Sequence, residues 1–82
     1  MTTNDYLDWL KKWFSEKLQL PADAETRDIF AEKWLTSLDA LMLVVDIEKK
    51  LKIKLSDESL GDKRFLTMNG IAEILRESDI NT

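Results

Sequence analysis

The chain has 82 residues, 44% of them hydrophobic and 34% charged, with a formal net charge of −4 at pH 7, a composition typical of one small soluble domain. It contains no histidine and no cysteine, which excludes a Ser-His-Asp triad, a thiolate nucleophile and a thiolate zinc site. The negative charge argues against binding to nucleic acid, and no apolar run approaches the ~20 residues of a membrane span.

Helical spacing of apolar residues runs through the whole sequence, which contains only two glycines and one proline. This pattern predicts an all-α fold: a small bundle of three longer helices, one short third helix, and a long loop between the first and second helices. A single domain is expected over residues 1–82, with residues 1–3 and 78–82 frayed. Without an apolar signal-peptide core near its start, the chain is expected in the cytoplasm.

The first helix is predicted to begin at Thr3 or Asn4, either of which can act as an N-cap. Leu20-Pro21 is expected to end it, because a residue before proline disfavours the helical backbone. The expected apolar stripe comprises Tyr6, Leu7, Trp9, Leu10, Trp13, Phe14 and Leu18. We interpret its tryptophans as core residues rather than as a stacking platform, because aromatic residues at helical spacing usually pack inside.

The connection from Pro21 to Thr36 contains an apolar cluster of Ile29, Phe30 and Trp34. A connection of this length is unusual in a small domain unless it packs on the core or has a function. We therefore expect it to pack on the core.

The second helix is predicted from Leu38 to about Lys50, capped by Thr36 or Ser37. Its apolar positions almost encircle it, which exceeds the stripe that a surface helix needs. Spacing assigns to the core Ala40, Leu43, Val44, Ile47 and Leu51. A partly exposed partner surface is assigned to Leu38, Leu41, Met42 and Val45, with a rim of Asp39, Glu48 and Lys49. The equally weighted alternative is that these four apolar residues pack against the loop of residues 29–34.

The remaining sequence predicts a short helix and a final longer one. Ser56-Asp57-Glu58 is expected to cap the short helix, which Gly61 ends, and is not interpreted as part of a metal site. Thr67 is expected to cap a helix that ends at about Glu77. The apolar anchors of this half are Phe65, Leu66, Met68, Ile71, Ile74 and Leu75. The lysines Lys49, Lys50, Lys52 and Lys54 are interpreted as a solvated helix end, with contact to an acidic partner as the less favoured alternative.

Together these motifs resemble acyl carrier proteins and the carrier domains of polyketide and peptide synthetases. The resemblance rests on the Ser37-Leu38 pair that opens the second helix, on Glu48-Lys49-Lys50-Leu51, on Ile53-Lys54-Leu55, and on Thr67-Met68-Asn69-Gly70-Ile71. Phe30 also stands where synthetase carrier domains often have an aromatic residue. Thr36 stands where the family usually has aspartate.

The resemblance implies that Ser37 carries a covalent 4′-phosphopantetheine arm, with Thr36 and Leu38 beside the attachment point. A phosphopantetheinyl transferase would install the arm, and acyl-activating, acyl-transferring and condensing enzymes would act on acyl groups held as thioesters. The chain would be a non-catalytic monomer in fatty-acyl, lipid or secondary-metabolite biosynthesis. Met68 and Leu43 are expected to line a site where an acyl chain slips between the helices.

Two alternatives stay open from the residues alone. A serine at a helix start is most often an N-cap, so Ser37 could have only that role. The whole chain could also be an unmodified helical protein-interaction domain with a carrier-like fold. A DNA-binding helical domain is disfavoured, because no basic recognition helix is present.

Overall fold

The computed structural model describes residues 2–80, apart from the side chains of Ser37, Asp57, Asp79 and Ile80, and contains no strand in this range. Its elements in chain order are α1 (Thr3–Ser15), the 3-10 helix η1 (Ala24–Thr26), α2 (Ser37–Asp46), the π-helical turn η2 (Ile47–Leu51), α3 (Asp57–Leu60), the 3-10 helix η3 (Lys63–Leu66) and α4 (Met68–Ile80). The predicted all-α fold, with three longer helices, a short third helix and a long first connection, is confirmed.

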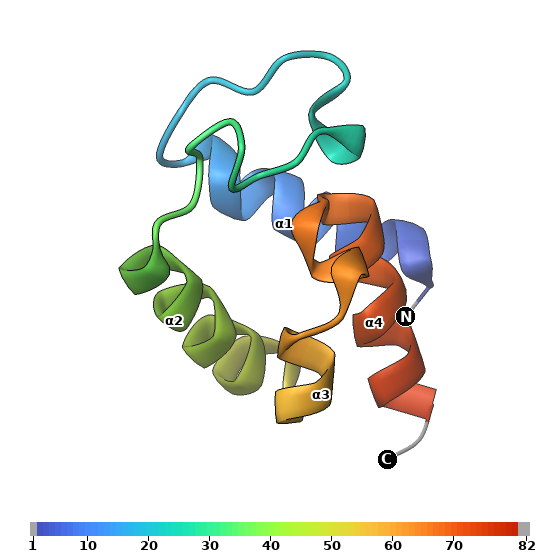
Figure 1. The fold of residues 1–82 in the computed structure, drawn as a ribbon. Helices are drawn as coiled ribbons and strands as arrows, with labels where there is room; N and C mark the ends of the chain where they lie inside the picture. The colour runs from blue at the N-terminus through green and yellow to red at the C-terminus, as the bar shows by residue number, and fades with distance from the viewer. Residues whose placement is uncertain (1, 81–82) are drawn as a thin grey trace.

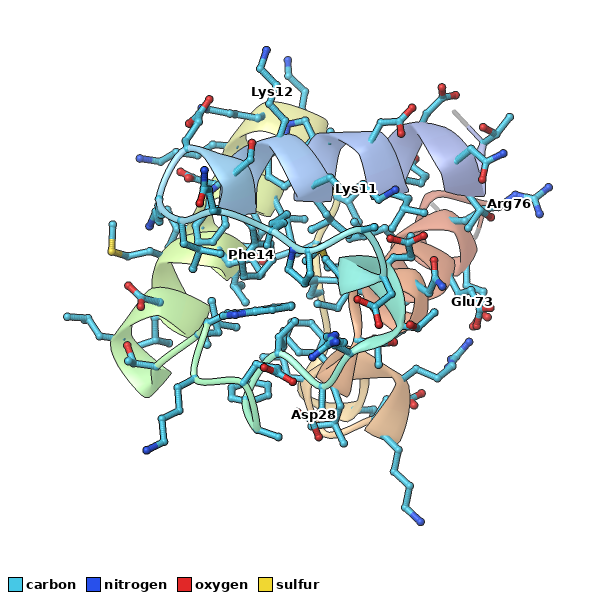
Figure 2. All side chains as sticks on the ribbon, turned by 90° about the horizontal axis from the view of Figure 1, so that it is seen from above. Lys11, Lys12, Phe14, Asp28, Glu73 and Arg76 are labelled. Carbon is cyan, nitrogen blue, oxygen red and sulfur yellow. The ribbon has the colours of Figure 1, made fainter. Side chains whose placement is uncertain are left out.

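The helices surround one hydrophobic core (Figure 1). α1 packs on α4, and η3 also packs on α4, while α2 lies on the other side of the molecule. Figure 2 shows Phe14 pointing from α1 into the interior, where its side chain is fully buried. The buried core residues are Tyr6, Leu10, Trp13, Phe14, Ala24, Ile29, Leu35, Leu43, Ile47, Ile53, Phe65, Met68, Ile71, Ala72, Ile74 and Leu75.

Both ends of α1 differ from the prediction. The N-cap is Thr2, whose Oγ1 accepts a hydrogen bond from the Asp5 amide at 3.3 Å, while Asp5 Oδ2 accepts one from the Thr2 amide at 2.9 Å. The helix ends at Ser15, well before Pro21, because the Lys17 amide turns back to the Phe14 carbonyl at 3.0 Å. This tight turn also places the Lys17 ammonium 4.1 Å from the centre of the Trp13 ring, a cation–π contact.

The long connection packs on the core, as predicted, but Phe30 does not follow its neighbours. Ile29 is fully buried and Trp34 packs against the core, whereas Phe30 is 37% exposed. Leu35, which the sequence reading did not single out, is buried. The Ile29 amide donates to the Leu66 carbonyl at 2.8 Å, so the connection is fastened to η3.

The α-helical part of α2 is shorter than predicted. It ends at Asp46 and continues as the π-helical turn η2, after which Lys52 adopts a left-handed backbone with φ of 57°. A residue in this conformation is a common helix terminator. The predicted core positions divide into Leu43 and Ile47, which are fully buried, and a partly buried group of Ala40, Val44 and Leu51.

The C-terminal half has the predicted caps. Ser56 Oγ accepts a hydrogen bond from the Ser59 amide at 3.2 Å at the start of α3, and Thr67 Oγ1 accepts one from the Gly70 amide at 3.0 Å at the start of α4. Phe65 is buried, but Leu66 is 40% exposed. α4 runs to Ile80, past the expected end near Glu77. The fraying expected at residues 1 and 81–82 lies outside the described residues.

Candidate functional site

The start of α2 is capped by Thr36 and not by Ser37. Thr36 Oγ1 accepts a hydrogen bond from the Asp39 amide at 3.2 Å, and Asp39 Oδ2 accepts one from Thr36 Oγ1 at 3.0 Å and one from the Thr36 amide at 3.4 Å. This reciprocal arrangement is a capping box, and Ser37 is the first residue inside the helix. The alternative in which Ser37 serves as the N-cap is therefore wrong.

The position of Ser37 suits an attached phosphate. A helix N-terminus has backbone N–H groups without intrahelical partners and a partial positive charge, both of which stabilise an anion. Neither histidine nor cysteine occurs in the chain to activate a hydroxyl. A phosphodiester at this position would be stabilised by the same N–H groups and partial positive charge.

The predicted partner surface of α2 faces solvent. Leu38 is 68% exposed, Leu41 65%, Met42 48% and Val45 45%. The alternative in which these four residues pack against the loop of residues 29–34 is therefore wrong. Of the predicted rim, Glu48 and Lys49 are exposed, whereas Asp39 belongs to the capping box.

An open pocket of about 350 Å³ adjoins this face of α2. It lies between α2, the α3–η3 segment and Phe30 of the long connection. Its lining residues are Phe30, Ala40, Leu41, Val44, Leu60, Gly61, Asp62, Lys63, Phe65 and Leu66. Ala40 and Leu41 follow Ser37 by three and four positions and so lie on the same side of the helix.

The pocket differs from the acyl site expected from the sequence. The side chains of Leu43 and Met68 are fully buried, and neither residue lines this pocket. Sequence reasoning missed Phe30, Leu60 and Leu66 as lining residues because they come from three separate segments. A usable signal was present, since each is a large apolar residue outside the regular apolar stripes.

Arg64 fastens one wall of the pocket to α4. Its Nη2 donates to Asp62 Oδ2 at 3.0 Å and to Glu77 Oε1 at 3.1 Å. The hydrogen bonds from Arg64 lower the pKa of the Asp62 carboxyl and the pKa of the Glu77 carboxyl. Asp62 lines the pocket, so this network connects the pocket wall with the packed half of the molecule.

The end of α2 is joined to α1 by a part-buried polar contact at the edge of the exposed face, where Asp46 lines a depression with Met42 and Val45. Trp13 Nε1 donates a hydrogen bond of 2.8 Å to Asp46 Oδ2. The Trp13 side chain is otherwise buried and lies edge-on to Phe14 at 5.0 Å. The interpretation of the tryptophan as a core residue agrees with this environment.

Comparison with protein families identifies the domain. A family model described as "Phosphopantetheine attachment site" matches residues 8–77, a range that includes the start of α2 and the whole pocket. No curated protein and no solved structure gives a significant match. Across residues 2–80, no helix has the length and apolar character needed to cross a membrane.

The match covers most of the chain and confirms the resemblance found in the sequence. Domains of this family are carriers that serve partner enzymes and are generally non-catalytic. The chain belongs to the phosphopantetheine attachment family, and it is a carrier protein of the acyl-carrier type whose cofactor is covalently attached 4′-phosphopantetheine.

Proposed function

We propose that Ser37 is the attachment residue and that the chain is an acyl carrier protein of fatty-acyl, lipid or secondary-metabolite biosynthesis. The observation that carries this proposal is the assignment of the N-cap to Thr36, which leaves Ser37 at the first position of α2 without a capping role. The family match includes this position.

The chain's part in arm attachment is to present a hydroxyl at a helix N-terminus. Ser37 Oγ forms a bond to the phosphorus of the pantetheine phosphate in coenzyme A, the nucleotide portion leaves, and a base of the transferase takes the hydroxyl proton. The partial positive charge of the α2 N-terminus then stabilises the phosphodiester. The attached arm supplies a terminal thiol that holds acyl groups as thioesters.

The pocket beside α2 indicates the class of cargo. Its walls are mostly apolar side chains, with Leu41 and Phe30 at the exposed edge and Val44 and Phe65 more deeply placed. Apolar walls favour a hydrocarbon chain over a charged group, because burial of an unpaired charge is costly. We therefore infer that the cargo is an acyl chain, which the arm can place in this pocket by folding back.

The exposed side of α2 is the proposed contact with partner enzymes. It comprises Leu38, Leu41, Met42 and Val45, with Asp39, Glu48 and Lys49 at its edges. A contiguous exposed apolar surface next to a modification site commonly marks a protein contact. The partners would be the transferase, acyl-activating or acyl-transferring enzymes and condensing enzymes. The carrier would serve them as a cytoplasmic monomer.

One feature favours a second candidate, an unmodified protein-interaction domain with the same fold. Thr36 occupies the position before Ser37 at which this family usually has aspartate. Should that carboxylate be needed by the transferase, the exposed face of α2 would still bind partners without an arm.

Intact-mass measurement distinguishes the two candidates. The purified chain is incubated with coenzyme A, Mg²⁺ and a broad-specificity phosphopantetheinyl transferase, with an omission of coenzyme A as the control. A gain of one phosphopantetheine supports the carrier function. An unchanged mass with several transferases would favour the unmodified interaction domain.

A further inference from the structure

The long connection contributes one aromatic ring to the pocket beside α2. Ile29 is fully buried and anchors the connection in the core, whereas its neighbour Phe30 lines the pocket and remains 37% exposed. A ring left this open gains only part of the stabilisation that full burial gives. The core thus accounts for Ile29 but only in part for Phe30, whose burial a ligand in the pocket would complete.

The backbone around Phe30 is held in a hydrogen-bonded turn. Asp28 Oδ1 accepts a hydrogen bond from the Phe30 amide at 2.9 Å and one from the Ala31 amide at 3.0 Å. The Ile29 amide donates to the Leu66 carbonyl at 2.8 Å, which fastens the turn to η3, and Leu66 lines the same pocket. Phe30 therefore belongs to a wall that is in place before a ligand binds, which reduces the cost of ordering it.

The volume of the pocket indicates the length of chain that it can hold. A dry cavity of about 150 Å³ holds benzene, which has six carbons. The pocket beside α2 measures about 350 Å³, which by the same measure corresponds to a hydrocarbon on the order of ten carbons. Because the pocket is open, a longer chain would leave its remaining carbons in water.

The charged residues of the lining do not indicate a charged cargo. Asp62 and Lys63 have opposite signs, and Arg64 Nη2 already donates to Asp62 Oδ2 at 3.0 Å. The other side chains of the lining are apolar. A plain hydrocarbon chain therefore suits the pocket better than an acyl group that ends in a carboxylate or an amine, since burial of an unpaired charge is costly.

We propose that Phe30 is a specificity-determining residue that makes the pocket favour acyl chains of medium length, on the order of ten carbons. This inference rests on the proposed carrier function and names the length class of its cargo. The gain from burial grows with the apolar area removed from water. A two-carbon acyl group would therefore gain little from the ring, and a chain that fills the pocket would gain most.

Chain-length dependence of thioester protection tests the inference. A broad-specificity phosphopantetheinyl transferase loads the chain from acetyl-, hexanoyl-, decanoyl- or hexadecanoyl-coenzyme A, and the rate of thioester cleavage by hydroxylamine is measured. Cleavage is expected to slow from acetyl to decanoyl and to slow no further for hexadecanoyl. Phe30→Ala is expected to speed cleavage of the decanoyl thioester about three- to tenfold without changing that of the acetyl thioester, and Phe30→Leu to restore part of the protection.

The matched control is Lys33→Asn, an exposed residue of the same turn that does not line the pocket. Its φ of 60° is one that asparagine tolerates, and no effect is expected. An equal effect of Phe30→Ala on acetyl and decanoyl thioesters, or an effect of Lys33→Asn as large, would overturn the role of Phe30. Protection that still rises from decanoyl to hexadecanoyl would overturn the preferred length. Both results leave the carrier function intact, whereas no mass gain on the unsubstituted chain would overturn that function as well.

Discussion

Thr36 and Ser37 are adjacent hydroxyl residues that occupy different positions relative to α2. Thr36 is the N-cap and exchanges hydrogen bonds with Asp39, while Ser37 is the first helical residue. A cap holds a helix start in place, whereas an attachment residue must be available to another enzyme. The two neighbouring residues can therefore be separated by experiment.

We predict different effects of alanine at these two positions on the free energy of unfolding. Thr36→Ala removes the cap and is expected to lower it by about 1 kcal/mol. Because Thr36 is the N-cap, Ser37→Ala leaves the cap in place and is expected to change it by less than about 0.5 kcal/mol. Urea unfolding followed by tryptophan fluorescence measures both values. An equal loss in the two variants would return the capping role to Ser37.

Among the elements, η3 approaches α4 so closely that only glycine fits at residue 70. A Cβ atom placed there would lie 1.8 Å from the carbonyl oxygen of Arg64. We predict that Gly70→Ala lowers the free energy of unfolding by about 1–3 kcal/mol, because backbone has to move to relieve the overlap. The matched control is Gly61→Ala, since Gly61 is exposed and has no positive φ. A similar loss in both variants would show that glycine flexibility, and not the close approach, is responsible.

The Arg64 network predicts a loss of stability in acid. Hydrogen bonds from Arg64 lower the pKa of Asp62 and of Glu77 in the folded protein. The stability gained from these carboxylates is therefore present above their unfolded pKa values, about pH 4, and is lost as the pH falls through the folded values. Arg64→Gln should flatten this part of the pH profile, as measured by melting temperature between about pH 5 and pH 2. An unchanged profile in Arg64→Gln would assign the acid sensitivity to other carboxylates.

The exposed and buried sides of α2 should respond differently to substitution. Met42→Glu or Val45→Glu is expected to lower the rate of a partner enzyme by about tenfold and to change the free energy of unfolding by less than about 0.5 kcal/mol. Leu43, next to Met42, is fully buried. Leu43→Ala is therefore the contrasting variant and should cost about 2–5 kcal/mol. Circular dichroism with partner kinetics measures both effects, and a large loss of stability in Met42→Glu would place Met42 in the core.

The buried and exposed sides of α2 were also the feature of the fold that the sequence predicted best. The 3.6-residue repeat alone separated Leu43 and Ile47 from Leu41, Met42 and Val45, and the structure buries the first pair and exposes the other three. The N-cap of α2 was harder to predict, because threonine and serine are both common N-caps and Thr36 and Ser37 are adjacent. Only the contact with Asp39 distinguishes them.

A local turn and contacts between distant segments account for the features that the sequence did not show. α1 ends at Ser15 because of a local turn, although Pro21 suggested a longer helix. The pocket needs Phe30, Leu60 and Leu66 to converge from segments far apart in the chain, which no local periodicity describes. Leu43 and Met68, which were expected to line an acyl site between the helices, are fully buried and do not line this pocket.

Over the whole molecule, structure and proposed function divide between two sides. α1 and α4 pack closely, and Arg64 ties η3 to α4. α2 and α3 lie on the side of the molecule away from α1 (Figure 1). The exposed apolar residues of α2 and the pocket between α2 and the α3–η3 segment are on this side. This division would let partners and cargo bind on one side while the packed α1–α4 pair maintains the fold.

Locating the phosphopantetheine arm on the chain tests the central claim most directly. The chain is treated with coenzyme A, Mg²⁺ and a phosphopantetheinyl transferase, digested, and analysed by tandem mass spectrometry. Ser56→Ala is the matched control for Ser37→Ala, because Ser56 is an exposed serine at the start of another helix. We predict the arm on Ser37, its loss in Ser37→Ala and its retention in Ser56→Ala. An arm that persists in Ser37→Ala, or that maps to another residue, would contradict the account.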